Sequence, residues 1–89
     1  MYRFKISEHL QDILKRLSRK DNQLYERLLA KMNEVVHCYD VEHYKNLRYN
    51  MKDSKRVHVG HFVLVLQYNK EDNEIIFDDF DHHDSVYKQ

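Results

Sequence analysis

Phe62-Val63-Leu64-Val65-Leu66 is an apolar run that contains no polar side chain. Successive side chains of a strand point to opposite faces, so a strand with this sequence would be buried on both sides. The run therefore predicts a central strand that is covered on each face. Gly60, the single glycine of the chain, stands just before it. Glycine adopts positive φ at little steric cost, so we expect a tight turn at Gly60 and an antiparallel partner strand before it.

Four further segments around this run have strand character. Residues 2–7 and 55–59 alternate between apolar and polar side chains, and residues 45–49 show a weaker strand pattern. Residues 74–80 contain another apolar stretch, and the polar residues 69–73 before it predict a turn. The sequence therefore predicts five strands, and the last three are joined by short turns.

Two segments between the first strand and the others have the apolar spacing of amphipathic helices. Ser7 and Asp21 are suited to cap them, because their side-chain oxygens can accept backbone N–H groups. The apolar stripes are Leu10, Ile13, Leu14 and Leu17 in the first helix, and Leu24, Leu28, Leu29, Met32, Val35 and Val36 in the second. We predict an α+β fold of order β-α-α-β-β-β-β in a single domain over residues 1–89. Its antiparallel sheet would carry the N-terminal helical hairpin packed on one face.

Histidines follow or precede the apolar strands at one end of the predicted sheet. If Tyr68 pairs with Glu74 across the polar turn, Phe62 lies near Phe80. The turn at Gly60 and this register then collect four histidines at the same edge: His58, His61, His82 and His83. A slip of one residue would change which of them share a face. The sequence predicts the cluster but does not decide its facing.

Such a cluster permits three interpretations, because imidazole is the side chain whose proton affinity lies nearest neutral pH. One is a metal site, to which Asp79 and Asp81 could add carboxylates. Against it, His82 and His83 are adjacent and would point to opposite faces of a strand, and no Cys pair or HExxH spacing is present. The second is general acid–base catalysis. The third is that these histidines are solvated polar residues at strand ends.

Acid–base catalysis suits an RNA phosphodiester, because RNA carries its own nucleophile in the 2′-hydroxyl. The reaction needs a base for that proton, an acid for the 5′-oxygen and cations for the phosphate charge, with no metal or other cofactor. His58 and His83 could exchange the protons. Arg56, Lys55 and Lys45 could hold phosphate, and Tyr87 could stack on a base.

The composition is that of a small globular protein, with 42% hydrophobic and 34% charged residues in 89. Cys38 is the single cysteine, so we expect no disulfide and a reducing, cytoplasmic environment. Cys38 has no adjacent activating base and is expected to be a buried small apolar residue. No signal-peptide-like start and no apolar run long enough to cross a membrane is present, so no membrane partner is expected.

The charge is balanced overall but unevenly distributed. Residues 1–56 hold thirteen Lys and Arg against eight Asp and Glu, whereas residues 57–89 hold two against seven. This asymmetry indicates either a region that meets a polyanion or an acidic partner, or simply a pair of solvated helix faces.

The order of elements and the tail of the chain resemble the RelE/ParE toxin superfamily. The tail His82-His83-Asp84-Ser85-Val86-Tyr87 fits the pattern H-[RH]-x-x-[VI]-Y, and the strands on either side of Gly60 match as well. Many members carry an arginine shortly after this glycine, where this chain has Val63. The histidine-using, YafQ-type branch is more similar, because it has histidines that match His58 and His83.

The resemblance implies the toxin of a type II toxin–antitoxin pair, a ribosome-dependent, metal-independent mRNA endonuclease. Its partners would be a RelB-like antitoxin, mRNA and the ribosome. Residue chemistry and resemblance together assign catalytic roles to His58, His83, Arg56 and Tyr87. They assign RNA or phosphate contacts to Lys45, Lys55, His61 and His82.

A non-catalytic binding module is the rival interpretation. The ParE branch of the same superfamily blocks DNA gyrase, and a degenerate toxin could bind only antitoxin or DNA. Such a binder would not require the pair His58 and His83. The histidine pair therefore favours the nuclease.

Overall fold

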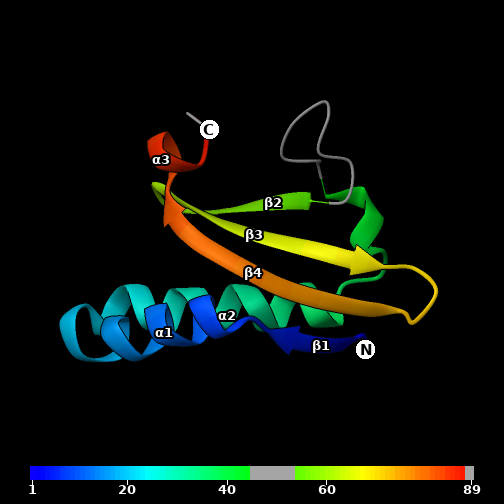
Figure 1. Cartoon of the computed structure of the whole chain (residues 1–89), viewed down its shortest axis with the longest axis horizontal. Coiled ribbons are helices and arrows are strands. Elements are labelled where there is room, and N and C mark those ends of the chain that lie inside the picture. The colour runs from blue at the N-terminus through cyan, green and yellow to red at the C-terminus, as the bar shows by residue number, and fades with distance from the viewer. Residues whose placement is uncertain (45–53, 88–89) are drawn as a thin grey trace.

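The computed structural model of the protein describes residues 1–44 and 54–87 (Figure 1). In chain order its elements are β1 (Arg3–Ile6), α1 (Glu8–Lys20), α2 (Asn22–His37), the 3-10 helix η1 (Val41–His43), β2 (Ser54–Val59), β3 (Phe62–Asn69), β4 (Glu74–His82) and α3 (His83–Tyr87). The weak strand expected at residues 45–49 lies outside the described residues. None of the described helices is both long and apolar enough to cross a bilayer.

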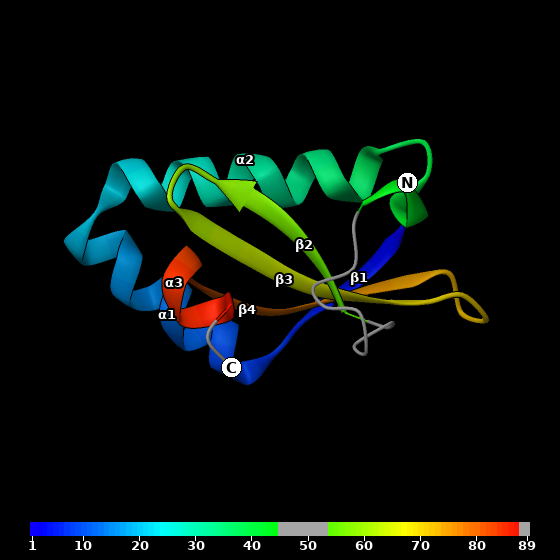
Figure 2. The same ribbon diagram turned by 90° about the horizontal axis from the view of Figure 1, so that it is seen from above.

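The four described strands form one sheet in the order β1-β4-β3-β2. The hairpin of α1 and α2 covers one face, and the short α3 lies on the other (Figures 1 and 2). The predicted α+β fold with a helical hairpin on one face is confirmed. The sheet is mixed rather than wholly antiparallel, because β1 runs parallel to β4. A parallel pair needs a long crossover, and here the helical hairpin and two strands separate β1 from β4 in sequence.

The predicted helix caps are both present. Ser7 Oγ accepts the backbone N–H of Leu10 at 3.0 Å, and Asp21 Oδ1 accepts that of Leu24 at 3.1 Å. These bonds satisfy N–H groups that have no partner within their own helix. The caps fix where α1 and α2 begin, and therefore which stripe of each helix faces the sheet.

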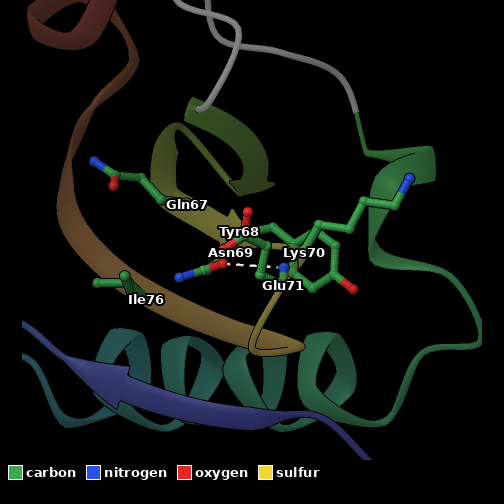
Figure 3. A pocket seen from close by; sticks show the side chains of 6 residues that line it. All are labelled: Gln67, Tyr68, Asn69, Lys70, Glu71 and Ile76. Carbon is green, nitrogen blue, oxygen red and sulfur yellow. Dashed lines mark hydrogen bonds between the residues drawn. The ribbon is translucent and has the colours of Figure 1, made fainter.

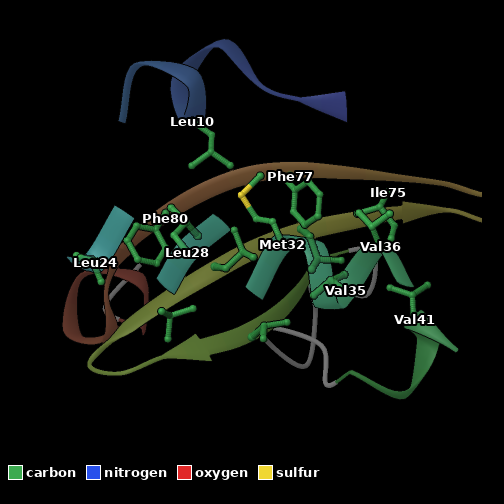
Figure 4. Close-up of a cluster of buried hydrophobic side chains, with 14 residues drawn as sticks. Leu10, Leu24, Leu28, Met32, Val35, Val36, Val41, Ile75, Phe77 and Phe80 are labelled. Atoms are coloured by element: carbon green, nitrogen blue, oxygen red, sulfur yellow. The ribbon is translucent and has the colours of Figure 1, made fainter. Parts of the chain in front are cut away.

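The main hydrophobic core lies between the helical hairpin and the sheet (Figure 4). The side chains of Leu10, Leu28, Leu64 and Phe77 are fully buried within it. A smaller cluster on the opposite face consists of Val63, Val65 and Val86. The prediction that β3 is buried on both sides is therefore confirmed, with α3 supplying part of the second cover.

The register of β3 against β4 differs by one residue from the expected one. Asn69, not Tyr68, lies opposite Glu74, so the expected pairing was wrong. The side chain of Asn69 accepts a backbone N–H two residues further on at 3.1 Å, and Asn73 takes a left-handed conformation with φ of 52°. Asparagine tolerates both roles better than most residues, and the turn is thereby shortened to residues 70–73.

A β-bulge shifts the second half of β4 once more. Val65 lies opposite Asp79 but Leu66 lies opposite Phe77, so Asp78 is an extra residue with no partner in β3. As a result, the last residue of β4 lies opposite the first residue of β3. The bulge thus determines which residue of β4 lies at the end of the sheet, where the chain turns into α3.

Candidate active site

His58 and His83 lie together on the face of the sheet away from the helical hairpin. The centroids of their rings are 5.6 Å apart, and the ring planes are stacked at 29°. The backbone N–H of His83 donates to the carbonyl of His61 at 2.9 Å, which ties the start of α3 to the β2–β3 turn. Of the four predicted cluster members, the structure therefore brings His58 and His83 into ring contact.

Strand alternation and α3 explain this placement. Val57 and Val59 belong to the core beneath the sheet, so His58 between them points to the other face. The chain leaves β4 at His82 and turns into α3, where Val86 packs into the small cluster on β3. This packing holds His83 over the same face as His58.

Asp84 places a carboxylate beside His83 and His82. Its Oδ1 lies 3.6 Å from His83 Nδ1, and its Oδ2 lies 3.9 Å from His82 Nδ1. The attraction acts when the imidazole is protonated, and 71% of the Asp84 side chain is exposed, so solvent weakens it. Asp84 belongs to the tail motif and was not among the predicted site residues. Its position next to two histidines in the sequence was the available signal.

His82 and His61 do not join the ring contact. The ring of His82 packs edge-on against Phe62, with centroids 5.5 Å apart, and Phe62 in turn stacks on Phe80 of the main core. His61 lies exposed in the turn and contributes its backbone carbonyl to His83. The rings of His82 and His83 thus have different neighbours, Phe62 for His82 and His58 for His83.

The predicted cations divide between the two faces of β2. Arg56 lies opposite Val65 and, by alternation, on the same face as His58. Lys55 lies on the opposite face, and its Nζ donates to the carbonyl of Tyr44 at 3.3 Å. The structure therefore places Arg56, but not Lys55, on the face of the histidine pair.

Two further predicted site residues lie at the edge of the described ranges or outside them. Tyr87 is the last residue of α3. Lys45 lies outside the described residues.

The other candidate chemistries receive less support from the side chains. Among residues 1–44 and 54–87, no three His, Cys, Asp or Glu side chains come close enough to hold a metal ion together. Burial raises the pKa of the Cys38 thiol, and the nearby carboxylate of Asp40 adds to the effect. A thiol with a raised pKa holds less of the reactive thiolate at neutral pH. Cys38 was expected to be buried, and the structure has it half-buried against the main core.

A separate hollow of about 430 Å³ lies at the other end of the sheet, around the β3–β4 turn (Figure 3). Its lining includes Gln67, Tyr68 and Lys70. The histidine pair lies at the opposite end of β3, where β2 turns into it. This hollow is therefore not part of the candidate site.

Solved structures with the same fold are toxins and toxin complexes. The fold is similar to that of an Escherichia coli RelE variant in the free state, with a TM-score of 0.74, 20% identity and 98% and 90% of the two chains covered. The intact E. coli RelBE toxin–antitoxin complex matches with a TM-score of 0.72 and 18% identity over 92% of this chain and 96% of that chain. E. coli YafQ matches with a TM-score of 0.63 and 13% identity over 98% and 99%. At these identities the likeness establishes a RelE-type fold.

Sequence relatives take the assignment further. No family model matches the chain. It is 42% identical over 90 residues to a candidate toxin named RelE4 from Methanocaldococcus jannaschii, with 100% of this chain and 94% of that protein covered. It is also 38% identical over 88 residues to an uncharacterized protein of Methanosarcina mazei, with 98% and 100% covered. The chain belongs to the RelE toxin family, which confirms the resemblance seen in its sequence.

Proposed function

We propose that this protein is the toxin of a type II toxin–antitoxin pair and cleaves mRNA at the ribosome by metal-independent acid–base catalysis. The observation that carries the proposal is the pair of stacked rings of His58 and His83, exposed at one end of the sheet. Family membership supports the toxin role, and the histidine pair supplies the chemistry.

The reaction uses the 2′-hydroxyl of the substrate as nucleophile. One imidazole takes the 2′ proton while the 2′-oxygen attacks phosphorus, and the other gives a proton to the departing 5′-oxygen. The products are a 2′,3′-cyclic phosphate and a free 5′-hydroxyl. With ring centroids 5.6 Å apart, both imidazoles can reach the oxygens of one phosphodiester. His58 and His83 therefore form the proposed proton-transfer pair.

Neighbouring groups have supporting roles in this proposal. Arg56, on the same face of β2, offsets charge that develops on the phosphate. Asp84, whose Oδ1 lies 3.6 Å from His83 Nδ1, helps to orient the ring of His83. Tyr87 stacks on a base, and Lys45 contacts phosphate. Lys55 is not given a phosphate role, because its ammonium group is engaged by the Tyr44 carbonyl.

The partner that silences the toxin is proposed to be a RelB-like antitoxin. The fold matches the toxin of solved complexes named RelBE, including those of E. coli and Mycobacterium tuberculosis. The proposed site of action is the cytoplasm, where ribosomes and mRNA meet.

The test is cleavage of mRNA on programmed ribosomes by the purified, antitoxin-free protein. We expect new mRNA ends within the codon in the ribosomal A site, mapped by primer extension. Intact mRNA combined with inhibition of DNA supercoiling by gyrase would contradict the proposal and support the binding-module interpretation.

A further inference from the structure

Arg27 of α2 lies against the glycine turn that borders the candidate site. A Cβ atom added at Gly60 would lie 3.1 Å from Arg27 Nη2 and 3.3 Å from Nη1, which is tighter than ordinary contact. Gly60 also has a φ of 61°, the left-handed region that favours glycine. The single glycine of the chain therefore makes the turn, and the Arg27 guanidinium lies close to its backbone.

Arg27 lines a surface hollow of about 450 Å³ that lies between the beginning of α2 and the β2–β3 turn. Figure 2 shows these two segments side by side. Leu24 and Phe62 form part of its apolar wall, and His61 adds an exposed imidazole. Asp21 also lines the hollow, and its Oδ1 accepts the N–H that caps α2. The hollow thus combines apolar walls and one carboxylate with two groups that can donate to an anion.

Within the described ranges 1–44 and 54–87, Arg27 makes no ion pair or hydrogen bond. A guanidinium presents up to five N–H donors in a planar fork that matches the oxygens of a phosphate. An arginine held at an exposed turn without a carboxylate partner can therefore offer that fork to a ligand.

The turn connects this guanidinium to the histidine pair. Arg27 rests on Gly60, the next residue His61 accepts the backbone N–H of His83, and the ring of His83 stacks on His58. A polynucleotide that places one phosphate at the rings and continues around the β2–β3 turn would bring another backbone phosphate to Arg27.

We propose that Arg27 binds a backbone phosphate of the mRNA beyond the scissile one, across the β2–β3 turn, and positions the strand for cleavage. The inference rests on the proposed function, because it assumes that RNA occupies the histidine site. Arg27 is a positioning residue rather than a catalytic one: it contacts the strand beyond the reacting atoms.

The experiment measures binding of single-stranded RNA with 2′-O-methyl groups, which cannot supply the nucleophile, at several NaCl concentrations. Each phosphate contact contributes about 0.7 to the slope of log K against log salt on a single strand. Arg27→Gln is expected to reduce the magnitude of that slope by about this amount and to weaken binding several-fold at low salt. Arg27→Lys should restore much of the slope, because it keeps the charge.

Lys70→Gln is the matched control, because it removes one positive charge from an exposed position in the β3–β4 turn, at the other end of the sheet. It should leave the slope unchanged. Equal slopes for wild type, Arg27→Gln and Lys70→Gln would overturn the inference. Failure of the wild type to cut mRNA on ribosomes would contradict the proposed function instead, while the binding slopes would still decide the role of Arg27.

Discussion

Replacing His83 with alanine is expected to lower the rate of mRNA cleavage on programmed ribosomes by about 10²–10⁴-fold, the usual contribution of a general acid or base. The ring of His83 stacks on that of His58 at the exposed end of the sheet, so its loss removes one of the two proton-transfer groups. His58→Ala should have an effect of similar size. The double variant should lose far less than the product of the two single effects, because the residues act as a unit.

The control for this prediction is His37→Ala. His37 is exposed in the last turn of α2, and its Nδ1 contacts the carbonyl of Asn33 within that helix. The His37→Ala protein should cleave mRNA at the wild-type rate. Because His58 and His83 are exposed, their variants should also keep the wild-type melting temperature, so lost activity would reflect chemistry. If His83→Ala cuts mRNA as fast as the wild type, the catalytic assignment is wrong.

Replacing Phe77 with alanine is expected to lower the free energy of unfolding by about 3–5 kcal/mol. Phe77 is fully buried in the main core, and its ring also packs edge-on against Phe4 at 5.9 Å. A chain of this size buries a modest core, and its total stability is expected to be about 5–15 kcal/mol. The loss should therefore lower the melting temperature by more than about 12 °C, as measured by circular dichroism.

Tyr39→Ala is the control, because the Tyr39 side chain is fully exposed at the end of α2. It should change the unfolding free energy by less than about 0.5 kcal/mol. A Phe77→Ala protein that melts within a few degrees of the wild type would show that the sheet and the hairpin do not pack around Phe77. Since Phe77 directly precedes the bulge in β4, that result would also question the placement of α3 and His83.

The fold could be predicted from periodicity because its elements are locally consistent. The apolar run of β3, the caps Ser7 and Asp21 and the two helical stripes each point to the same architecture. The parallel pairing of β1 with β4 could not be predicted from the sequence, because alternation shows that a strand exists but not which neighbour it pairs with. The register was wrong because Asn69 closes the turn and Asp78 forms a bulge, and neither feature alters the apolar pattern.

The candidate site was predicted in part for the same reason. Short turns bring His58 and the tail of the chain to one edge, so the proximity of His83 followed from topology. Alternation along β2 already puts Lys55 on the face opposite to His58, whichever face packs on the hairpin, so this separation could be read from the sequence. Arg27 could not be predicted as a site residue, because its place next to Gly60 depends on how α2 packs against the sheet, which no local sequence pattern reveals.

The central claim, that this protein cuts mRNA by using the 2′-hydroxyl of the substrate, is tested most directly with two mRNAs on programmed ribosomes. One is all-ribose, and the other carries a single 2′-deoxy nucleotide at the mapped cleavage position. We expect the wild-type protein to cut the first and leave a 2′,3′-cyclic phosphate, while the second stays intact at that position. Cleavage of the 2′-deoxy mRNA at the same position and rate would contradict the account.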